Sequence, residues 1–188
     1  MKITTLLGSA RKKGNTSTVL GWVEDELKSL GHDVDRIYLH NKSIAGCLGC
    51  SKCREKPNEI GCVQKDDAIE IMEQMIISDV VLYASPIYFW SFSAQMKALI
   101  DRTYSLVANY GEPGHTSLMR GKRLSLLVTG ADGYEDNAED MFSAFDKMVD
   151  YFIAVKAGEL YVGNCSEPSE LSDDVMEQAK TLAQSLVS

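Results

Sequence analysis

The sequence predicts a three-layer α/β fold in which helices cover both faces of a five-stranded parallel sheet. Five short apolar stretches alternate with five segments in which apolar residues recur at helical spacing. The stretch at 80–84 is almost entirely apolar, as is typical of a central parallel strand that is covered on both faces. The chain of 188 residues is long enough to bury a full core, and we expect one domain over residues 1–188.

The first predicted unit is a strand, a glycine loop and a helix. Residues 3–7 have strand character, and residues 8–14 form the loop. The helix then runs to about Leu30, and we expect Asn15 or Thr16 to be its N-cap. A helix start offers free backbone N–H groups and the positive end of its dipole to an anion. Polar and cationic side chains make this loop a candidate phosphate site: Ser9, Arg11, Asn15, Thr16 and Ser17.

Two common phosphate motifs do not fit this loop. A P-loop requires a lysine where Asn15 stands, and the G-x-G-x-x-G fingerprint of classical dinucleotide folds is also missing. A nucleoside triphosphate and a classical dinucleotide are therefore disfavoured as ligands. An ordinary strand-to-helix turn with a polar cap is the alternative for this loop.

Four more strands and four more helices follow along the chain. The strands are predicted at 34–39, 80–84, 123–129 and 160–163. The helices are predicted at about 66–77, 94–107, 137–153 and 173–187. The third of these helices carries methionine and phenylalanine residues at core spacing, which indicates burial rather than a cofactor site.

The loop after the third strand is the second candidate wall of a ligand site. Parallel sheets bind ligands at the carboxyl edge of their strands, so this loop and the phosphate loop are expected to meet there. An aromatic wall at that edge suits a flat ring with hydrogen-bonding edges. The candidate residues are Pro86, Ile87, Tyr88, Phe89 and Trp90. A surface aromatic cluster that serves a subunit contact is the alternative.

Three pieces of the chain together resemble the flavodoxin-like NAD(P)H-dependent FMN reductases. They are Gly8-Ser9-x-Arg11-x-x-Gly14-Asn15-Thr16, Ser85-Pro86-Ile87-Tyr88 and Lys97-x-x-x-Asp101-Arg102. The resemblance covers roughly the first 105 residues. It implies the strand order 2-1-3-4-5, with FMN bound between the first and third strands. By family position, the loop after the fourth strand would approach the flavin ring through Thr129, Gly130 and Asp132, with a plain turn as the alternative.

The resemblance also implies a function. The chain would be an FMN-dependent oxidoreductase that takes hydride from NAD(P)H and passes electrons to a quinone, a flavin or another small acceptor. Because the cofactor carries this chemistry, we expect no dedicated catalytic side chain, and a helix-surface ion pair explains Lys97 and Asp101. The alternative is a flavodoxin-like or iron–sulfur flavoprotein electron carrier without NAD(P)H activity of its own. The family further implies a homodimer or homotetramer.

Charge and composition disfavour several other classes. A net charge of −8 argues against a nucleic-acid partner, although residues 1–65 carry 11 Lys and Arg against 7 Asp and Glu, which suits a small anionic ligand there. No apolar run is long enough for a membrane span, and a strand rather than a signal peptide is predicted at the amino end, so we expect a cytoplasmic location. A G-x-S-x-G hydrolase motif is also absent.

Four of the five cysteines are concentrated in an irregular segment, residues 40–65, that follows the second strand. Their spacing is C-x2-C-x2-C-x8-C, and such compact spacing suits a cluster or a zinc ion at Cys47, Cys50, Cys53 and Cys62. The pattern resembles that of the iron–sulfur flavoproteins, in which a [4Fe–4S] cluster relays electrons to FMN. The last gap is longer than in that pattern, and many FMN reductases carry similar cysteines without a cluster. Free or redox-active thiols are therefore the alternative, and a disulfide framework is not expected in a cytosolic chain.

Overall fold

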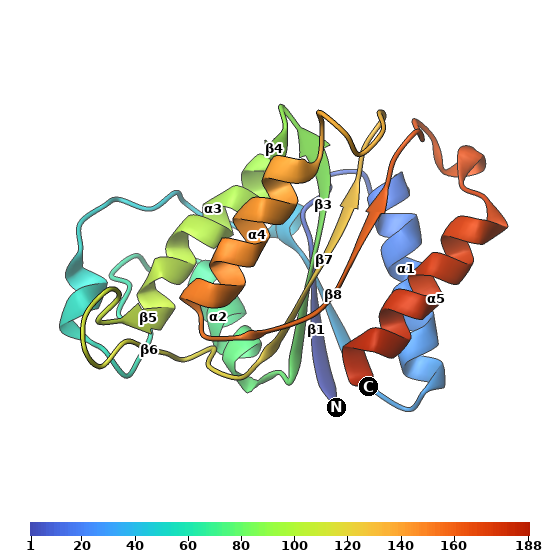
Figure 1. The fold of residues 1–188 in the computed structure, drawn as a ribbon. Helices are drawn as coiled ribbons and strands as arrows, with labels where there is room; N and C mark the ends of the chain where they lie inside the picture. Colours follow the sequence, from blue (N-terminus) through green and yellow to red (C-terminus); the bar gives the residue numbers. More distant parts are fainter.

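A computed structural model describes all 188 residues (Figure 1). Its middle layer is a sheet in the order β2-β1-β3-β7-β8, and every pairing along this path is parallel. The strands are β1 (Lys2–Leu7), β2 (Asp33–Tyr38), β3 (Val80–Tyr88), β7 (Arg123–Thr129) and β8 (Val155–Val162). The predicted strand order 2-1-3-4-5 is therefore confirmed.

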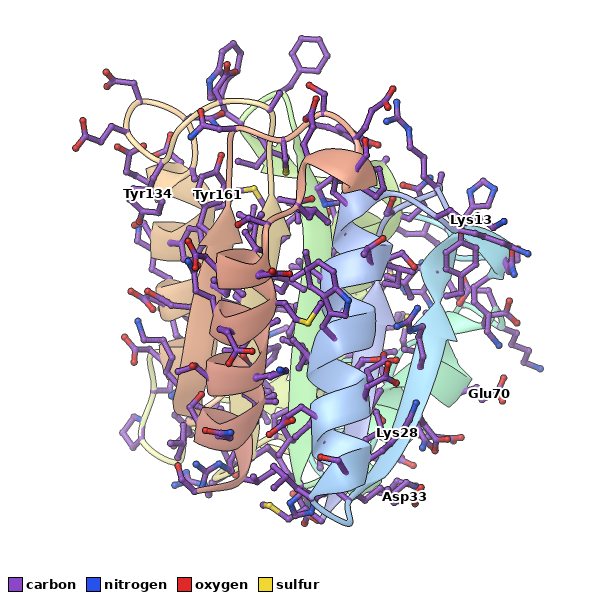
Figure 2. The ribbon with its side chains drawn as sticks, turned by 90° about the vertical axis from the view of Figure 1, so that its right-hand side faces the viewer. Lys13, Lys28, Asp33, Glu70, Tyr134 and Tyr161 are labelled. Atoms are coloured by element: carbon purple, nitrogen blue, oxygen red, sulfur yellow. The ribbon has the colours of Figure 1, made fainter.

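Five helices form the two outer layers. On one face of the sheet, α1 (Asn15–Ser29) and α5 (Asp173–Val187) lie side by side (Figure 2). The other face is covered by α2 (Ala68–Ile77), α3 (Ala94–Arg102) and α4 (Glu139–Tyr151) (Figure 1). The chain places β2 on one side of β1 and all later strands of the sheet on the other side. This reversal of direction opens a crevice at the carboxyl edge of such a sheet.

The core consists of two apolar clusters, one on each side of the sheet. Successive side chains of β3 alternate between them: Val81 and Tyr83 pack toward α2, α3 and α4, whereas Val80 and Leu82 pack toward α1 and α5. All five residues of the stretch 80–84 are inaccessible to solvent. The prediction of a central strand covered on both faces is confirmed.

Two strands are longer than the sequence pattern predicted. β3 continues to Tyr88 because β4 (Ser91–Phe92) folds back on its end as an antiparallel hairpin. β8 begins at Val155, because it pairs with β7 from Arg123 onward although its first residues lack an apolar pattern. In both cases pairing with another strand lengthens the element, and the hydrophobic periodicity of the sequence does not indicate that pairing.

The helix predicted at 94–107 is shorter in the structure. α3 ends at Arg102, and its last turn tightens into a 3₁₀ turn at Thr103–Leu106. A small hairpin follows, formed by β5 (Val107–Ala108) and β6 (Thr116–Ser117). Further 3₁₀ turns lie at Leu39–Asn41, Lys52–Glu55 and Pro168–Glu170. No helix in the structure has the length and apolar character that crossing a membrane requires.

Candidate functional site

A cleft of about 330 Å³ opens at the carboxyl edge of the sheet. Four loops that are far apart in the sequence form its wall, and they follow β1, β3, β7 and β8. The lining residues are Ser9, Arg11, Gly14, Asn15, Thr16, Pro86, Ile87, Tyr88, Thr129, Gly130, Ala131, Cys165 and Ser166. The volume is within the range of small-molecule sites, and the position is the one that the topology predicts.

The first loop presents the start of α1 to this cleft. The N-cap is Gly14, in extended backbone conformation and without a side-chain capping bond, so the prediction of Asn15 or Thr16 as the N-cap is wrong. Asn15, Thr16 and Ser17 are instead the first three helical residues, and their backbone amides have no acceptor in the structure. Three unpaired N–H groups at the positive end of a helix dipole form a ready anion site.

The side chains of this loop add to the anion site. The Ser9 hydroxyl is buried and accepts a hydrogen bond from the Arg11 amide at 3.2 Å, which shapes the turn. Arg11 is the only charged residue that lines the cleft, so an anion meets one guanidinium and no carboxylate there. The hydroxyls of Thr16 and Thr129 lie 2.7 Å apart and join the start of α1 to the end of β7.

Ser17 was predicted to be a phosphate ligand, but its side chain lies outside the cleft. Its Oγ accepts a hydrogen bond from Nη1 of Arg36 at 3.3 Å. The same guanidinium donates to the buried carboxylate of Glu24 through Nε and Nη2, at 2.8 and 2.7 Å. The Ser17 hydroxyl therefore belongs to a network that fastens α1 to β2, and only its backbone amide remains for a ligand.

The loop after β8 is a wall that sequence analysis missed. The side-chain amide of Asn15 donates to the Cys165 carbonyl at 2.9 Å, and Ser166 follows on the cleft wall. Burial raises the pKa of the Cys165 thiol, and the bond from Asn15 opposes this only in part, so no thiolate faces an anionic ligand. The sequence did contain one signal for this wall. A fifth parallel strand was predicted, and the loops that follow parallel strands all lie at the same edge of the sheet.

The loop after β3 divides into two parts. Pro86, Ile87 and Tyr88, which were predicted to face the flavin ring, line the cleft. Phe89 and Trp90 form the turn of the β3–β4 hairpin with φ values of 48° and 55°, and these residues are 92% and 60% exposed. They lie outside the cleft because a two-residue hairpin turn carries its side chains beyond the sheet edge.

The loop after β7 contributes mainly backbone to the cleft. Thr129, Gly130 and Ala131 line it, whereas Asp132 does not. The Asp132 carbonyl instead accepts a hydrogen bond from the Tyr161 hydroxyl at 2.6 Å. Tyr161 lies beside Tyr134 (Figure 2) and holds this loop from behind.

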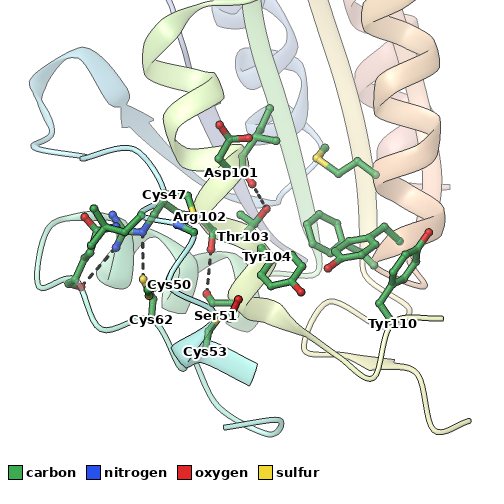
Figure 3. Close-up of a pocket in the computed structure, with 18 of the residues that line it drawn as sticks. Cys47, Cys50, Ser51, Cys53, Cys62, Asp101, Arg102, Thr103, Tyr104 and Tyr110 are labelled. Carbon is green, nitrogen blue, oxygen red and sulfur yellow. Dashed lines mark hydrogen bonds between the residues drawn. The ribbon is translucent and has the colours of Figure 1, made fainter. Parts of the chain in front are cut away.

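The four clustered cysteines line a second, larger cavity of about 670 Å³, between the cysteine segment, the end of α3 and α4 (Figure 3). Cys47 and Cys50 are exposed, Cys53 and Cys62 are half-buried, and all are free thiols. No three cysteine, histidine or carboxylate side chains are gathered closely enough to hold a metal ion. The predicted ligands therefore share one cavity without forming a closed metal site.

Arg102 fastens the cysteine segment to α3. Its side chain is fully buried and donates to both carboxylate oxygens of Asp66, at 2.6 and 3.0 Å. It also donates to the Cys62 sulfur at 3.2 Å and to the Ala45 carbonyl at 3.0 Å. Partial burial opposes ionisation of Asp66, but the bonds from Arg102 and from backbone amides outweigh it and lower the pKa of this carboxyl. The exposed pair Lys97–Asp101, with atoms 2.7 Å apart, is the surface ion pair expected from sequence.

Residues 1–166 match the family model described as NADPH-dependent FMN reductase. An iron-sulfur flavoprotein of Archaeoglobus fulgidus is 32% identical over 182 residues, which are 97% of this chain and 77% of that protein. An iron-sulfur flavoprotein of Methanosarcina thermophila is 37% identical over 106 residues, which are 56% of this chain and 54% of that protein. The chain thus aligns with only about half the length of the second relative.

Two solved structures show the same fold. The NAD(P)H:quinone oxidoreductase from Methanothermobacter marburgensis has a TM-score of 0.77 at 20% identity, over 100% of this chain and 96% of that chain. The FMN-dependent NADH-azoreductase from Bacillus anthracis, solved in complex with FMN, has a TM-score of 0.72 at 10% identity, over 100% of both chains. At these identities the likeness shows the fold alone, which is flavodoxin-like.

Proposed function

Because the chain belongs to the NADPH-dependent FMN reductase family, we propose that it is an oxidoreductase that binds FMN in the cleft at the sheet edge. In this proposal it takes hydride from NAD(P)H and passes electrons to a small acceptor. The observation that carries the proposal is the start of α1, where three backbone amides have no acceptor and where the cleft is lined by Arg11 and by no carboxylate.

The residues of the cleft fit the parts of FMN. The amides of Asn15, Thr16 and Ser17 would hold the phosphate, with Arg11 supplying charge. The side-chain oxygen of Asn15 is buried without a hydrogen-bond partner, so it can accept a hydrogen bond from a hydroxyl of the sugar-like chain. When bound, FMN supplies the ring that accepts hydride and releases electrons.

The other loops would orient the ring. Pro86, Ile87 and Tyr88 offer an apolar wall to it, and the backbone of Gly130 and Ala131 offers polar groups to its edge. The cleft has no free acid or base, so the protein's contribution is binding, orientation and electrostatics. The names of the structurally similar proteins refer to a quinone and to azo compounds, which supports a small planar acceptor.

Steady-state oxidation of NADH and NADPH by the purified, FMN-loaded protein tests this function, with a soluble quinone as acceptor. We expect turnover that requires both FMN and the quinone. A protein that binds FMN tightly but oxidises neither nicotinamide would instead be an electron carrier. FAD should bind more weakly than FMN, because the cleft provides one anion site, and equal affinity in a titration would count against this placement.

A second candidate, an iron–sulfur flavoprotein, is favoured by four cysteines on one cavity wall and by the names of two relatives. Thiolates are the donors that a [4Fe–4S] cluster requires, so the chemistry of the donor set fits. Their present arrangement is not a closed site, and cluster binding would require the segment to rearrange. Anaerobic purification with iron, zinc and sulfide assays decides this: about four iron and four sulfide per chain indicate a cluster. Absence of all three leaves free thiols.

A further inference from the structure

The 670 Å³ cavity has a tyrosine end that neither FMN binding nor the cysteines use. Tyr104, Tyr110 and Tyr151 form it, and Figure 3 places Tyr104 and Tyr110 on the side away from the cysteines. The ring of Tyr151 is nearly parallel to that of Tyr104, with centroids 6.3 Å apart, and lies 4.6 Å from that of Tyr110. The same three residues line an adjoining cavity of about 160 Å³. An aromatic surface of this kind suits a flat apolar ring.

The hydroxyl of Tyr151 is unsatisfied. It is buried and has no hydrogen-bond partner, although the side chain lines both cavities. Burial, together with the nearby Tyr104 and Tyr110, raises the pKa of Tyr151 to about 12, so the group stays an O–H donor at neutral pH. A buried donor without an acceptor is unfavourable, and an oxygen atom of a ligand would remove that cost.

Two cationic side chains on the walls of these cavities have no ion-pair partner. Lys147 lines the larger cavity and Arg54 the adjoining one, and neither forms an ion pair. The one carboxylate on either wall is Asp101, which is already paired with Lys97. The electrostatic balance therefore favours an anionic ligand over a neutral or cationic one.

We propose that the tyrosine end is a second small-molecule site, which binds a planar aromatic carboxylate. The ring packs among the three tyrosines, and the carboxylate accepts the hydrogen bond of Tyr151 and lies within the field of Lys147. The whole cavity, of which the tyrosine end is one part, has a volume typical of small-molecule sites. This site is separate from the cleft at the sheet edge and does not depend on the proposed reductase activity.

The test uses 2-naphthoate as the probe, titrated calorimetrically into oxidised, FMN-loaded protein without NAD(P)H. We expect saturable binding of one molecule per chain, and clearly weaker binding of the neutral 2-naphthamide. Tyr151→Phe removes only an unpartnered hydroxyl, so it should fold normally and weaken naphthoate binding about tenfold. Tyr83→Phe is the matched control, because its hydroxyl is also buried and unpartnered but lines neither cavity. It should retain wild-type affinity.

Three results would overturn the proposal. One is the absence of saturable naphthoate binding, as expected if a second copy of the chain fills the cavity. Another is equal affinity in Tyr151→Phe and wild type, as expected if the probe stacks at the flavin instead. The third is equal affinity for naphthoate and naphthamide. FMN affinity and NAD(P)H oxidation, measured on the same preparations, would report failure of the reductase function separately.

Discussion

The cleft at the sheet edge and the cavity beside the cysteines are built by different physical means. Four strand ends surround the cleft, and its anion donors are backbone amides of α1, so the sheet itself places them. The cysteine cavity depends on an irregular segment, and one buried side chain, Arg102, bonds to Ala45, Cys62 and Asp66. Topology can therefore position an anion-binding cleft without particular side chains, whereas a site on a long loop depends on a few specific bonds.

The largest expected effect is the loss of the Arg102 anchor. Arg102→Met should lower the free energy of unfolding by about 3–5 kcal/mol, because it leaves the Asp66 carboxylate without its buried partner. Urea denaturation followed by circular dichroism measures this. The matched control is Lys97→Met on the same helix, which breaks an exposed pair and should cost at most about 1 kcal/mol. Equal losses in the two variants would contradict the role assigned to Arg102.

The next effect tests whether backbone amides form the anion site. Asn15→Pro removes one amide at the first helical position, where proline is well tolerated and where the extended Gly14 before it is compatible. Compared with Asn15→Ala, which removes only the side chain, we expect FMN binding to weaken by a further 1.5–3 kcal/mol or so. Fluorescence titration measures both dissociation constants. Equal values would show that this amide does not contact the phosphate.

A smaller effect concerns the β3–β4 turn, which lies beside the cleft but does not line it. Two large aromatic residues occupy left-handed backbone conformations there, at a cost of roughly 1–2 kcal/mol each. Replacing Phe89 by Asn and Trp90 by Gly should therefore stabilise the fold by about 1 kcal/mol or more, as seen in the thermal midpoint. FMN affinity should not change, since neither side chain lines the cleft. A drop in affinity would instead place these aromatics on the flavin ring, as the sequence pattern predicted.

The last prediction concerns the pH dependence of the cysteine segment. The pKa of Asp66 is lower in the folded chain than in the unfolded one, so its pairing stabilises the fold above the unfolded value, about 3.9. This contribution is lost as the pH falls through the lower, folded pKa. Urea midpoints between pH 7 and pH 3 should therefore fall less in Asp66→Asn than in wild type. Parallel curves would exclude a depressed pKa at this position.

Several parts of the site could be predicted because the responsible signal is local. Gly8, the polar run after it and the apolar spacing of α1 lie within twenty residues, and the apolar stretch at 80–84 identifies the central strand. The N-cap was predicted at Asn15 or Thr16 but is Gly14, and the Asn15 side chain instead donates to the Cys165 carbonyl, 150 residues away. The same contact brings Cys165 and Ser166 to the cleft, and the only signal for them in the sequence is the end of the predicted fifth strand.

The sequence by itself determined the chain order of the five parallel strands and the five helices, because hydrophobic periodicity and turn chemistry are properties of short segments. It also determined which residue types could serve a phosphate or a metal. Only the tertiary structure decided which side chains remain free. The Ser17 hydroxyl accepts a hydrogen bond from Arg36, and the four cysteines line one cavity without being close enough to bind a metal ion. The Tyr151 hydroxyl has no hydrogen-bond partner. Each of these outcomes depends on which groups of distant segments the fold brings within hydrogen-bonding distance.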